Sequence, residues 1–502
     1  MFEYYKELKS EHEITFDMNN IDSVDDSTFK AWFAYNKEEF KKICTYAEKS
    51  NSVHVGVLLC KLRTALSNQQ ISFLFGVCET TVGNYIKIAI EDLIDHLVPK
   101  FINSDNRTEL INHVTPMSKA LFDIPIDKTC LIFDATYRLV KKSKNYSGQK
   151  QSWSEQKKCH LFVLGPFDAT HNDATILKDC FQRYPSEMSI IHENDVILVD
   201  RGFRDVIQFL TEHKGVKVHC PGLGQLNTLD ANLSRFVTKC RWIVEQVFAR
   251  LKMKFKIFAI PAHNSTLIHD YQALLIAFAL LNLFHQPILS DRINEDVAVL
   301  MKSRLHIPNQ LQSIVEKFNL SKVRAAFLQI EYVTLDNVEN NQQLCFPHLT
   351  LEDLYSISLG PYQIQNAISY YAEHQNEGIF LVSKFQPDAR HRTAAIRYTD
   401  FNITIQDPIL IKAYMKSRYR GGKHHHIFVL FDKALTGRNS IKEYFCTCES
   451  GARTVGCCSH IMTIIWYLGY GQYHEISTPN PGICDVSITI PKEKPQPIQT
   501  EN

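Results

Sequence analysis

The spacing of hydrophobic residues divides the chain into regions with different expected structures. From Val53 to about Leu97, apolar residues recur at helical intervals. Between about 125 and 290, apolar runs such as "TCLIFDATY" and "NDVILVDRGF" alternate with helical patterns such as "FVTKCRWIVEQVFARLKMKF". Short runs rich in β-branched residues predict buried strands, and strands that alternate with helices are typical of an α/β domain.

Six regions follow from these patterns. We expect a charge-rich N-terminal segment, an all-α helix-turn-helix module, an α/β domain, a helical connector, a small α+β domain and a disordered, Pro-rich tail. Their ranges are, in order, 1–50, 51–105, 125–290, 291–345, 346–475 and 476–502. A chain of 502 residues is too long for one ordinary hydrophobic core, so several domains are expected.

The composition is that of a soluble globular protein, with 45% hydrophobic and 22% charged residues. A net charge of +1 gives no overall attraction to nucleic acid or acidic membranes, so any nucleic-acid surface must be local. The most apolar run, Ala273 to Phe284, has about half of the ~20 residues that a membrane span needs. Because the first residues also lack the apolar stretch of a signal peptide, we expect an intracellular protein with reduced thiols and no membrane contact.

The cysteines are distributed unevenly. Nine of the fourteen lie singly between Cys44 and Cys345, as core cysteines do, whereas four fall within "CTCESGARTVGCCSH". Two close pairs in that stretch form a Cys₃His set, which binds structural zinc tetrahedrally. The expected ligands are Cys446, Cys448, Cys458 and His460. Cys457 could replace Cys458 if the register shifts. The alternative without a metal is that these are ordinary core cysteines.

The helical module has the order helix, short turn, helix. Ser67 is the expected N-cap of a first helix, "SNQQISFLFG", which ends at Gly76, and "ETTVGNYIKIAI" is the second helix. In a helix-turn-helix, the second helix enters the major groove of DNA. Its candidate contacts are Thr80, Thr81, Asn84, Tyr85 and Lys87. A plain helical bundle stays open as the alternative, because four Lys/Arg balance four Asp/Glu between positions 51 and 100.

Three acids stand out in the α/β region. Asp134 lies inside the buried run "LIFDATY", and Asp200 ends the run "VILVDRGF". A carboxylate in such a strand is costly unless it is paired or binds a cation. Glu245 borders the apolar stripe of a predicted helix, from which it could point toward both aspartates. Three converging carboxylates suit Mg²⁺ or Mn²⁺, and two such ions can support phosphodiester cleavage, although each acid alone could be an ordinary salt-bridged residue.

Local basic patches surround these acids. Between 138 and 158 there are seven Lys/Arg residues and a single acid, Glu155. Between 235 and 256 the only acid is Glu245. Arg241 and Lys252 fall on roughly the same helical face as Glu245, so we expect both to contact DNA.

The motifs "DATY", "WSEQKKCHL", "GPFDATHNDATIL", "VDRGF" and "RWIVEQVFARLKMKF" resemble, in order, the DDE domain of Harbinger/PIF-like transposases over about residues 55–290. This resemblance implies an RNase H-like fold, with Asp134, Asp200 and Glu245 as the catalytic acids. It also implies metal-dependent DNA cleavage, then joining of the freed 3′-hydroxyl to target DNA, by a nuclear protein that can act as a multimer. Asp173 matches a further recurrent family position that supports the active site.

The Cys-x-Cys and Cys-x-His pairs resemble the SWIM zinc finger, which implies binding of DNA or of a protein partner. Two features depart from the transposase pattern. Ala135 stands where such families usually have glycine, and only "FV" separates "CHL" from "LGPF", so a strand beside Asp134 is expected to be shortened or missing. The second hypothesis is therefore a domesticated, catalytically inactive DNA-binding or adaptor protein.

Overall fold

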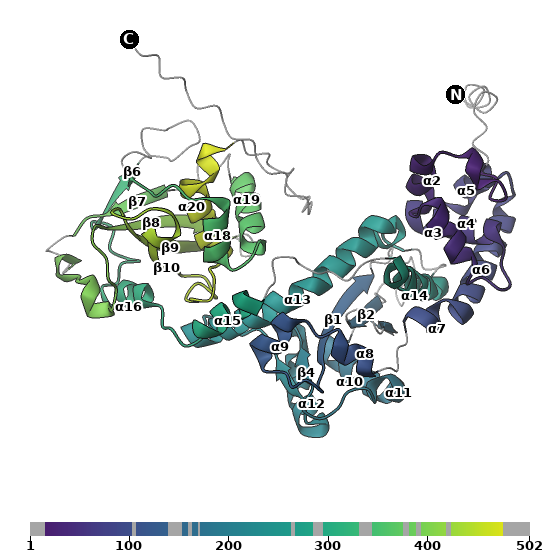
Figure 1. Ribbon diagram of the computed structural model, residues 1–502, viewed down its shortest axis with the longest axis horizontal. Helices are drawn as coiled ribbons and strands as arrows, with labels where there is room; N and C mark the ends of the chain where they lie inside the picture. Colours follow the sequence, from purple (N-terminus) through teal and green to yellow (C-terminus); the bar gives the residue numbers. More distant parts are fainter. Residues whose placement is uncertain are drawn as a thin grey trace, which may run out of the picture. The chain divides into compact units, whose positions relative to one another are not determined.

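The computed structural model describes most of the chain. The described residues are 16–102, 107–138, 153–158, 163–168, 171–262, 267–284, 295–330, 344–374, 381–387, 393–417 and 423–474, so the expected tail at 476–502 lies outside them. They divide into two compact units (Figure 1). Unit 1 takes the described residues within 1–220 and 237–290, and unit 2 takes those within 221–236 and 291–502. Helix α13 (Thr228–Lys254) begins in unit 2 and ends in unit 1.

Unit 1 begins with a set of short helices. They are α2 (Asp26–Phe33), α3 (Lys37–Cys44), α4 (Ser52–Thr64), α5 (Asn68–Phe75), α6 (Glu79–His96) and α7 (Val98–Phe101). The predicted boundaries of α5 are confirmed: the Ser67 side chain accepts from the backbone N–H of Gln70, and Gly76 takes a left-handed conformation (φ 64°) after the last turn. Glycine adopts this conformation without the steric cost of a Cβ atom, so it ends the helix.

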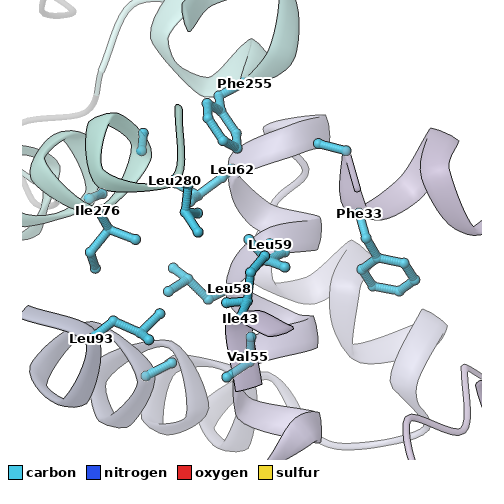
Figure 2. Close-up of a cluster of buried hydrophobic side chains, with 14 of the residues drawn as sticks. Phe33, Ile43, Val55, Leu58, Leu59, Leu62, Leu93, Phe255, Ile276 and Leu280 are labelled. Atoms are coloured by element: carbon cyan, nitrogen blue, oxygen red, sulfur yellow. The ribbon is translucent and has the colours of Figure 1, made fainter. Parts of the chain in front are cut away.

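Helices α2 to α7 share one hydrophobic core. Figure 2 shows Leu58, Leu59 and Leu62 of α4 among side chains of other helices. Ile276 and Leu280, from α14 (Leu267–Phe284), belong to the same buried cluster. The apolar run that is too short for a membrane span is therefore a core helix. No helix among the described residues is long and apolar enough to cross a bilayer.

A five-stranded sheet forms the other half of unit 1. Its strands are β1 (Cys130–Arg138), β2 (Trp153–Lys158), β3 (Val163–Asp168), β4 (Val196–Leu198) and β5 (Lys217–His219). Their order is β3-β2-β1-β4-β5; β1, β2 and β3 pair antiparallel, and β4 and β5 continue parallel to β1. The remaining helices of this region are α8 (Arg107–Asn112), α9 (Pro116–Phe122), α10 (Asp173–Arg183), α11 (Pro185–Met188) and α12 (Ile207–Lys214).

The expectation of a missing strand beside Asp134 is wrong. Strand β2 pairs with β1 over six residue pairs, including Asp134 with Lys157, and it also pairs with β3. Its sequence, "WSEQKK", has a single apolar residue, so it does not show the apolar pattern by which a strand is recognised. Strand formation here depends on the neighbouring strands rather than on local sequence.

A buried ion pair fixes the start of the two central strands. Asp195, directly before β4, is fully buried and receives two hydrogen bonds from Arg107 of α8, at 2.8 and 3.0 Å. The same carboxylate accepts from the backbone N–H groups of Thr129 and His192. These charge-assisted hydrogen bonds hold the pKa of Asp195 below its usual value against the effect of burial.

Unit 2 contains a second five-stranded sheet, which is fully antiparallel. Its order is β10-β9-β8-β7-β6, with β6 (Phe327–Ile330), β7 (Leu381–Phe385), β8 (Pro408–Lys416), β9 (His424–Asp432) and β10 (Ile441–Cys446). Its helices are α15 (Glu295–Ser303), α16 (Gln310–Lys317), α18 (Leu351–Ser358), α19 (Tyr362–His374) and α20 (Ser459–Gly469). The described residues within 291–345, which were expected as a helical connector, include α15, α16 and the edge strand β6.

The two faces of this sheet carry separate cores. Helices α18, α19 and α20 pack with residues such as Ile411 and Val429 on one face. Helix α16 packs with Leu410, Phe428 and Phe445 on the other. This division follows from the alternation of side chains along each strand.

Candidate nuclease and metal-binding sites

The fold brings the three predicted acids together. Asp134 lies on β1, and Asp200 follows β4 by two residues. Since Ile132 pairs with Leu198 in parallel register, Asp134 and Asp200 occupy equivalent positions on adjacent strands. Glu245 lies on α13 and is close enough to raise the pKa of Asp134.

Arg241 lies among these carboxylates, one helical turn before Glu245. Its guanidinium donates to Asp134 Oδ1 at 3.0 Å and lies 3.9 Å from Asp200 Oδ2. The Arg241 and Asp134 side chains are only 14% and 16% exposed, so water screens this pair weakly. Arg241 is therefore the counter-ion of the acidic cluster, although the sequence alone indicated a DNA contact.

The local environment makes Asp134 easier to protonate than an ordinary aspartate. Burial raises the pKa of Asp134 to about 6; Arg241 lowers it, while Asp200 and Glu245 raise it further. The pKa of Glu245 is also raised, because neighbouring protein displaces part of its water, and Arg241 opposes this shift. Crowded carboxylates of this kind gain from a cation, and divalent ions that prefer oxygen ligands fit the donor set.

Asp173 and Gly202 complete the acidic cluster. Asp173 begins helix α10, after Asn172 as N-cap. Asp200 caps the following 3₁₀ turn by accepting from the Gly202 N–H at 2.7 Å. A Cβ atom on Gly202 would meet the carboxylates of both Asp173 and Asp200, so only glycine fits between them without displacement.

The thiol-rich segment forms a preorganised four-ligand group. One ligand atom from each of Cys446, Cys448, Cys458 and His460 lies within 4.8 Å of the others. Cys446 Sγ and His460 Nδ1 are 3.9 Å apart, close to the separation of about 3.6 Å that a tetrahedral zinc site requires. The buried Cys457 is not part of this group, so the alternative register is not adopted.

Surrounding groups orient these ligands. Tyr370 Oη lies 3.0 Å from His460 Nε2, which leaves Nδ1 facing the cysteines. Burial alone would raise the pKa of Cys458, but hydrogen bonds from the Cys446 and Cys448 thiols, together with Arg453, lower it well below its usual value. A thiolate is thus favoured within the group, as zinc binding requires.

The start of α13 holds the segment between the two ligand pairs. Asn232 is fully buried; its Oδ1 accepts from the N–H groups of Thr454 and Val455, and its Nδ2 donates to Leu305 O at 2.9 Å. Gln225 donates to Cys448 O at 3.1 Å. Residues 221–236 therefore belong structurally to the same unit as the Cys₃His group.

The five residues expected to contact DNA in the helical module lie along the first half of α6. They are Thr80, Thr81, Asn84, Tyr85 and Lys87. Thr80, Asn84 and Lys87 are exposed, and Lys87 lies 3.9 Å from Glu91. Thr81 and Tyr85 are partly buried, and the Tyr85 ring packs 4.5 Å from that of His54. Lys252, the other expected contact, is exposed on α13 beyond Glu245.

Comparison with known families gives two matches that agree with this geometry. Residues 129–282 match the family model described as DDE superfamily endonuclease. Residues 55–99 match the model described as helix-turn-helix of DDE superfamily endonuclease. The chain carries a DDE superfamily endonuclease domain and its helix-turn-helix. Both matches support DNA as the partner, and the comparisons give no match among curated proteins or solved structures.

Three features of the sites do not follow from sequence spacing. The Arg241 counter-ion of the DDE domain joins Asp134 across 107 positions. Asn232 and Tyr370 support the Cys₃His group from 222 and 90 positions away. No local pattern marks them, because each was explicable as an ordinary helix residue. The position of Gly202 beside the Asp200 carboxylate, in contrast, has a local sequence signal. A glycine that follows a strand-ending acid, as in Asp-Arg-Gly at 200–202, indicates close backbone approach.

Proposed function

We propose that this protein is a DNA transposase-like endonuclease of the Harbinger/PIF type, in which Asp134, Asp200 and Glu245 form the catalytic triad. The observation that carries the proposal is the convergence of these acids within a domain that matches DDE endonucleases. The sheet order β3-β2-β1-β4-β5, with three antiparallel strands followed by two parallel ones, supports an RNase H-like core.

In this proposal the three carboxylates hold Mg²⁺ or Mn²⁺, which supplies Lewis acidity and an activated water or hydroxyl for phosphodiester chemistry. Asp134 and Asp200 are held by adjacent strands, so their relative position is set by the sheet register. Glu245 approaches from α13. Arg241 keeps Asp134 and Asp200 together in the metal-free protein, and the Gly202 N–H holds the Asp200 carboxylate.

The remaining modules bind partners. The helix-turn-helix contacts DNA through the exposed side of α6, and Lys252, exposed on α13, is a further candidate contact with the phosphate backbone. The Cys₃His group binds structural zinc as a SWIM-type finger, supported by its fit to tetrahedral geometry. A protein with these DNA-handling modules would act in the nucleus, and strand transfer would engage further copies of the chain or a protein partner.

A second function is favoured by one observation. Among the described residues, the only group of ligands gathered tightly enough for a metal is the Cys₃His group, while Arg241 lies between the DDE carboxylates. A protein whose arginine permanently replaces the metals would bind DNA without cutting it. This is the domesticated, inactive DNA-binding or adaptor alternative.

Metal binding by the triad separates the two functions without requiring the natural transposon end. Mn²⁺ titration by calorimetry should give binding to the zinc-loaded wild type and loss of that binding in Glu245→Gln. If Mn²⁺ binds neither protein, while helix-turn-helix DNA binding is retained, the non-catalytic function replaces the nuclease.

A further inference from the structure

The β8–β9 hairpin of unit 2 presents a stack of aromatic rings on an exposed part of its sheet. Tyr414 is 37% exposed, and its ring is stacked on that of His424 with a centroid distance of 4.6 Å and an interplanar angle of 7°. The ring of His426 lies 5.2 Å from Tyr414 at a tilt of 48°. We refer to Tyr414, His424 and His426 as the ring platform.

Strand register explains why these rings gather on one face. Tyr414 pairs with His426, and Lys416 pairs with His424, so all four side chains project from the same side of the sheet. His425, between the two platform histidines, projects from the opposite side, where its ring lies 4.6 Å from that of His460. The platform is thus separate from the Cys₃His group.

Positive charge surrounds the platform. Lys416 and Lys423 are exposed beside it, and no Asp or Glu occurs among the described residues of β6, β7 and β8, or from 423 to 431. The pKa of His426 is lowered to about 4 by burial and then by Lys412 and His424, both of which are positive or able to become so. Lys412 itself is held in place by donating to the carbonyls of Leu320 and Ser321.

Aromatic rings flanked by lysines fit one class of ligand. Single-stranded nucleic acid offers unpaired bases that stack on aromatic side chains and phosphates that attract ammonium groups. In a duplex both faces of a base are already stacked, so the ring platform would bind unpaired bases in preference to duplex DNA. We propose that the β8–β9 hairpin binds single-stranded DNA, with a base on the ring platform and phosphates near Lys416 and Lys423. DNA as the partner rests on the proposed function.

The test is fluorescence anisotropy of the full chain with a labelled oligothymidylate, with Tyr414→Ala as the main variant. Stacking on an aromatic ring predicts a loss of affinity of about fivefold to a hundredfold. Tyr473→Ala is the matched control, because Tyr473 is also exposed (40%) and packs against a histidine ring, that of His348, at 4.8 Å. The control should bind as wild type does.

A second variant tests the proposal independently if Tyr414→Ala does not fold. Lys423→Ser changes an exposed side chain outside the strands and should weaken binding and reduce its salt dependence. The proposal is overturned if the wild type does not bind the oligonucleotide, if Tyr414→Ala binds as tightly as wild type, or if Tyr473→Ala loses as much affinity. The anisotropy is measured without added Mg²⁺ or Mn²⁺, so it reports binding to the platform whether or not the acids of the α/β domain support cleavage, and failure of the nuclease function and failure of the platform are distinguished.

Discussion

Replacement of Asn232 by leucine should weaken zinc binding, although Asn232 is not a ligand. The side chain is fully buried on α13 and satisfies the N–H groups of Thr454 and Val455 and the carbonyl of Leu305. Leucine has a similar volume but no hydrogen-bonding atoms, so these three backbone groups would lose their partner.

The size of the effect follows from that count. A buried polar group that loses its partner costs about 1–3 kcal/mol, so three such groups correspond to about 3 kcal/mol or more. If the loss is confined to the conformation that presents Cys458 and His460, the zinc affinity falls by about a hundredfold or more, at 1.4 kcal/mol per factor of ten. The segment from Gly451 to Cys457 would also exchange its amide hydrogens faster.

Zinc affinity is measured by competition of the full chain with a chromogenic chelator. Asn227→Ala is the matched control: Asn227 is exposed and caps the same helix through Asp230 N–H at 2.8 Å, so it weakens the helix start without touching the zinc segment. Equal zinc affinity in wild type and a folded Asn232→Leu variant would refute the inference that Asn232 supports the Cys₃His group.

Three further predictions concern unit 1. Because burial raises the pKa of Asp134 to about 6, metal-dependent cleavage should increase as pH rises from 5 to 7. Arg241 lowers this pKa, so Arg241→Gln should move the increase in cleavage to higher pH. A cleavage rate that does not change with pH would contradict this prediction. Gly202→Ala should reduce cleavage while the melting temperature changes little, since the added Cβ would displace the Asp173 carboxylate and crowd that of Asp200, and unchanged activity would argue against the proposed role of Asp200. Arg107→Met should lower the free energy of unfolding in urea by about 3–5 kcal/mol, because Asp195 stays buried without its cation, and a loss below about 1 kcal/mol would show that the pair is dispensable.

Local sequence signals were sufficient for several elements. Ser67 and Gly76 bracket α5 as predicted, because capping depends on residues within one turn. The Cys₃His group was predictable for a similar reason, since both ligand pairs are close in sequence and lie at the ends of β10 and α20. Asp134 and Asp200 were recognisable because a charge in an apolar strand requires a compensating partner.

The sequence could not predict features that depend on distant partners. Strand β2 has a polar sequence and exists because β1 and β3 pair with it on both sides. The function of Arg241 depends on which carboxylates it meets, and a basic helix face is equally compatible with DNA contact. The boundary between the two units falls within α13, where a continuous helical pattern gives no sign of a division.

Nicking of supercoiled plasmid in Mn²⁺ shows whether the DDE carboxylates form a working nuclease. Wild type and Glu245→Gln are compared as zinc-loaded, full-length proteins at pH 7.5 or above, where Asp134 is ionised. The proposed function predicts nicking by the wild type and at least a hundredfold loss in Glu245→Gln, on the order of what removal of one transition-state stabilising group costs. Equal nicking by both proteins, or nicking by neither when both bind DNA through the helix-turn-helix, would contradict it.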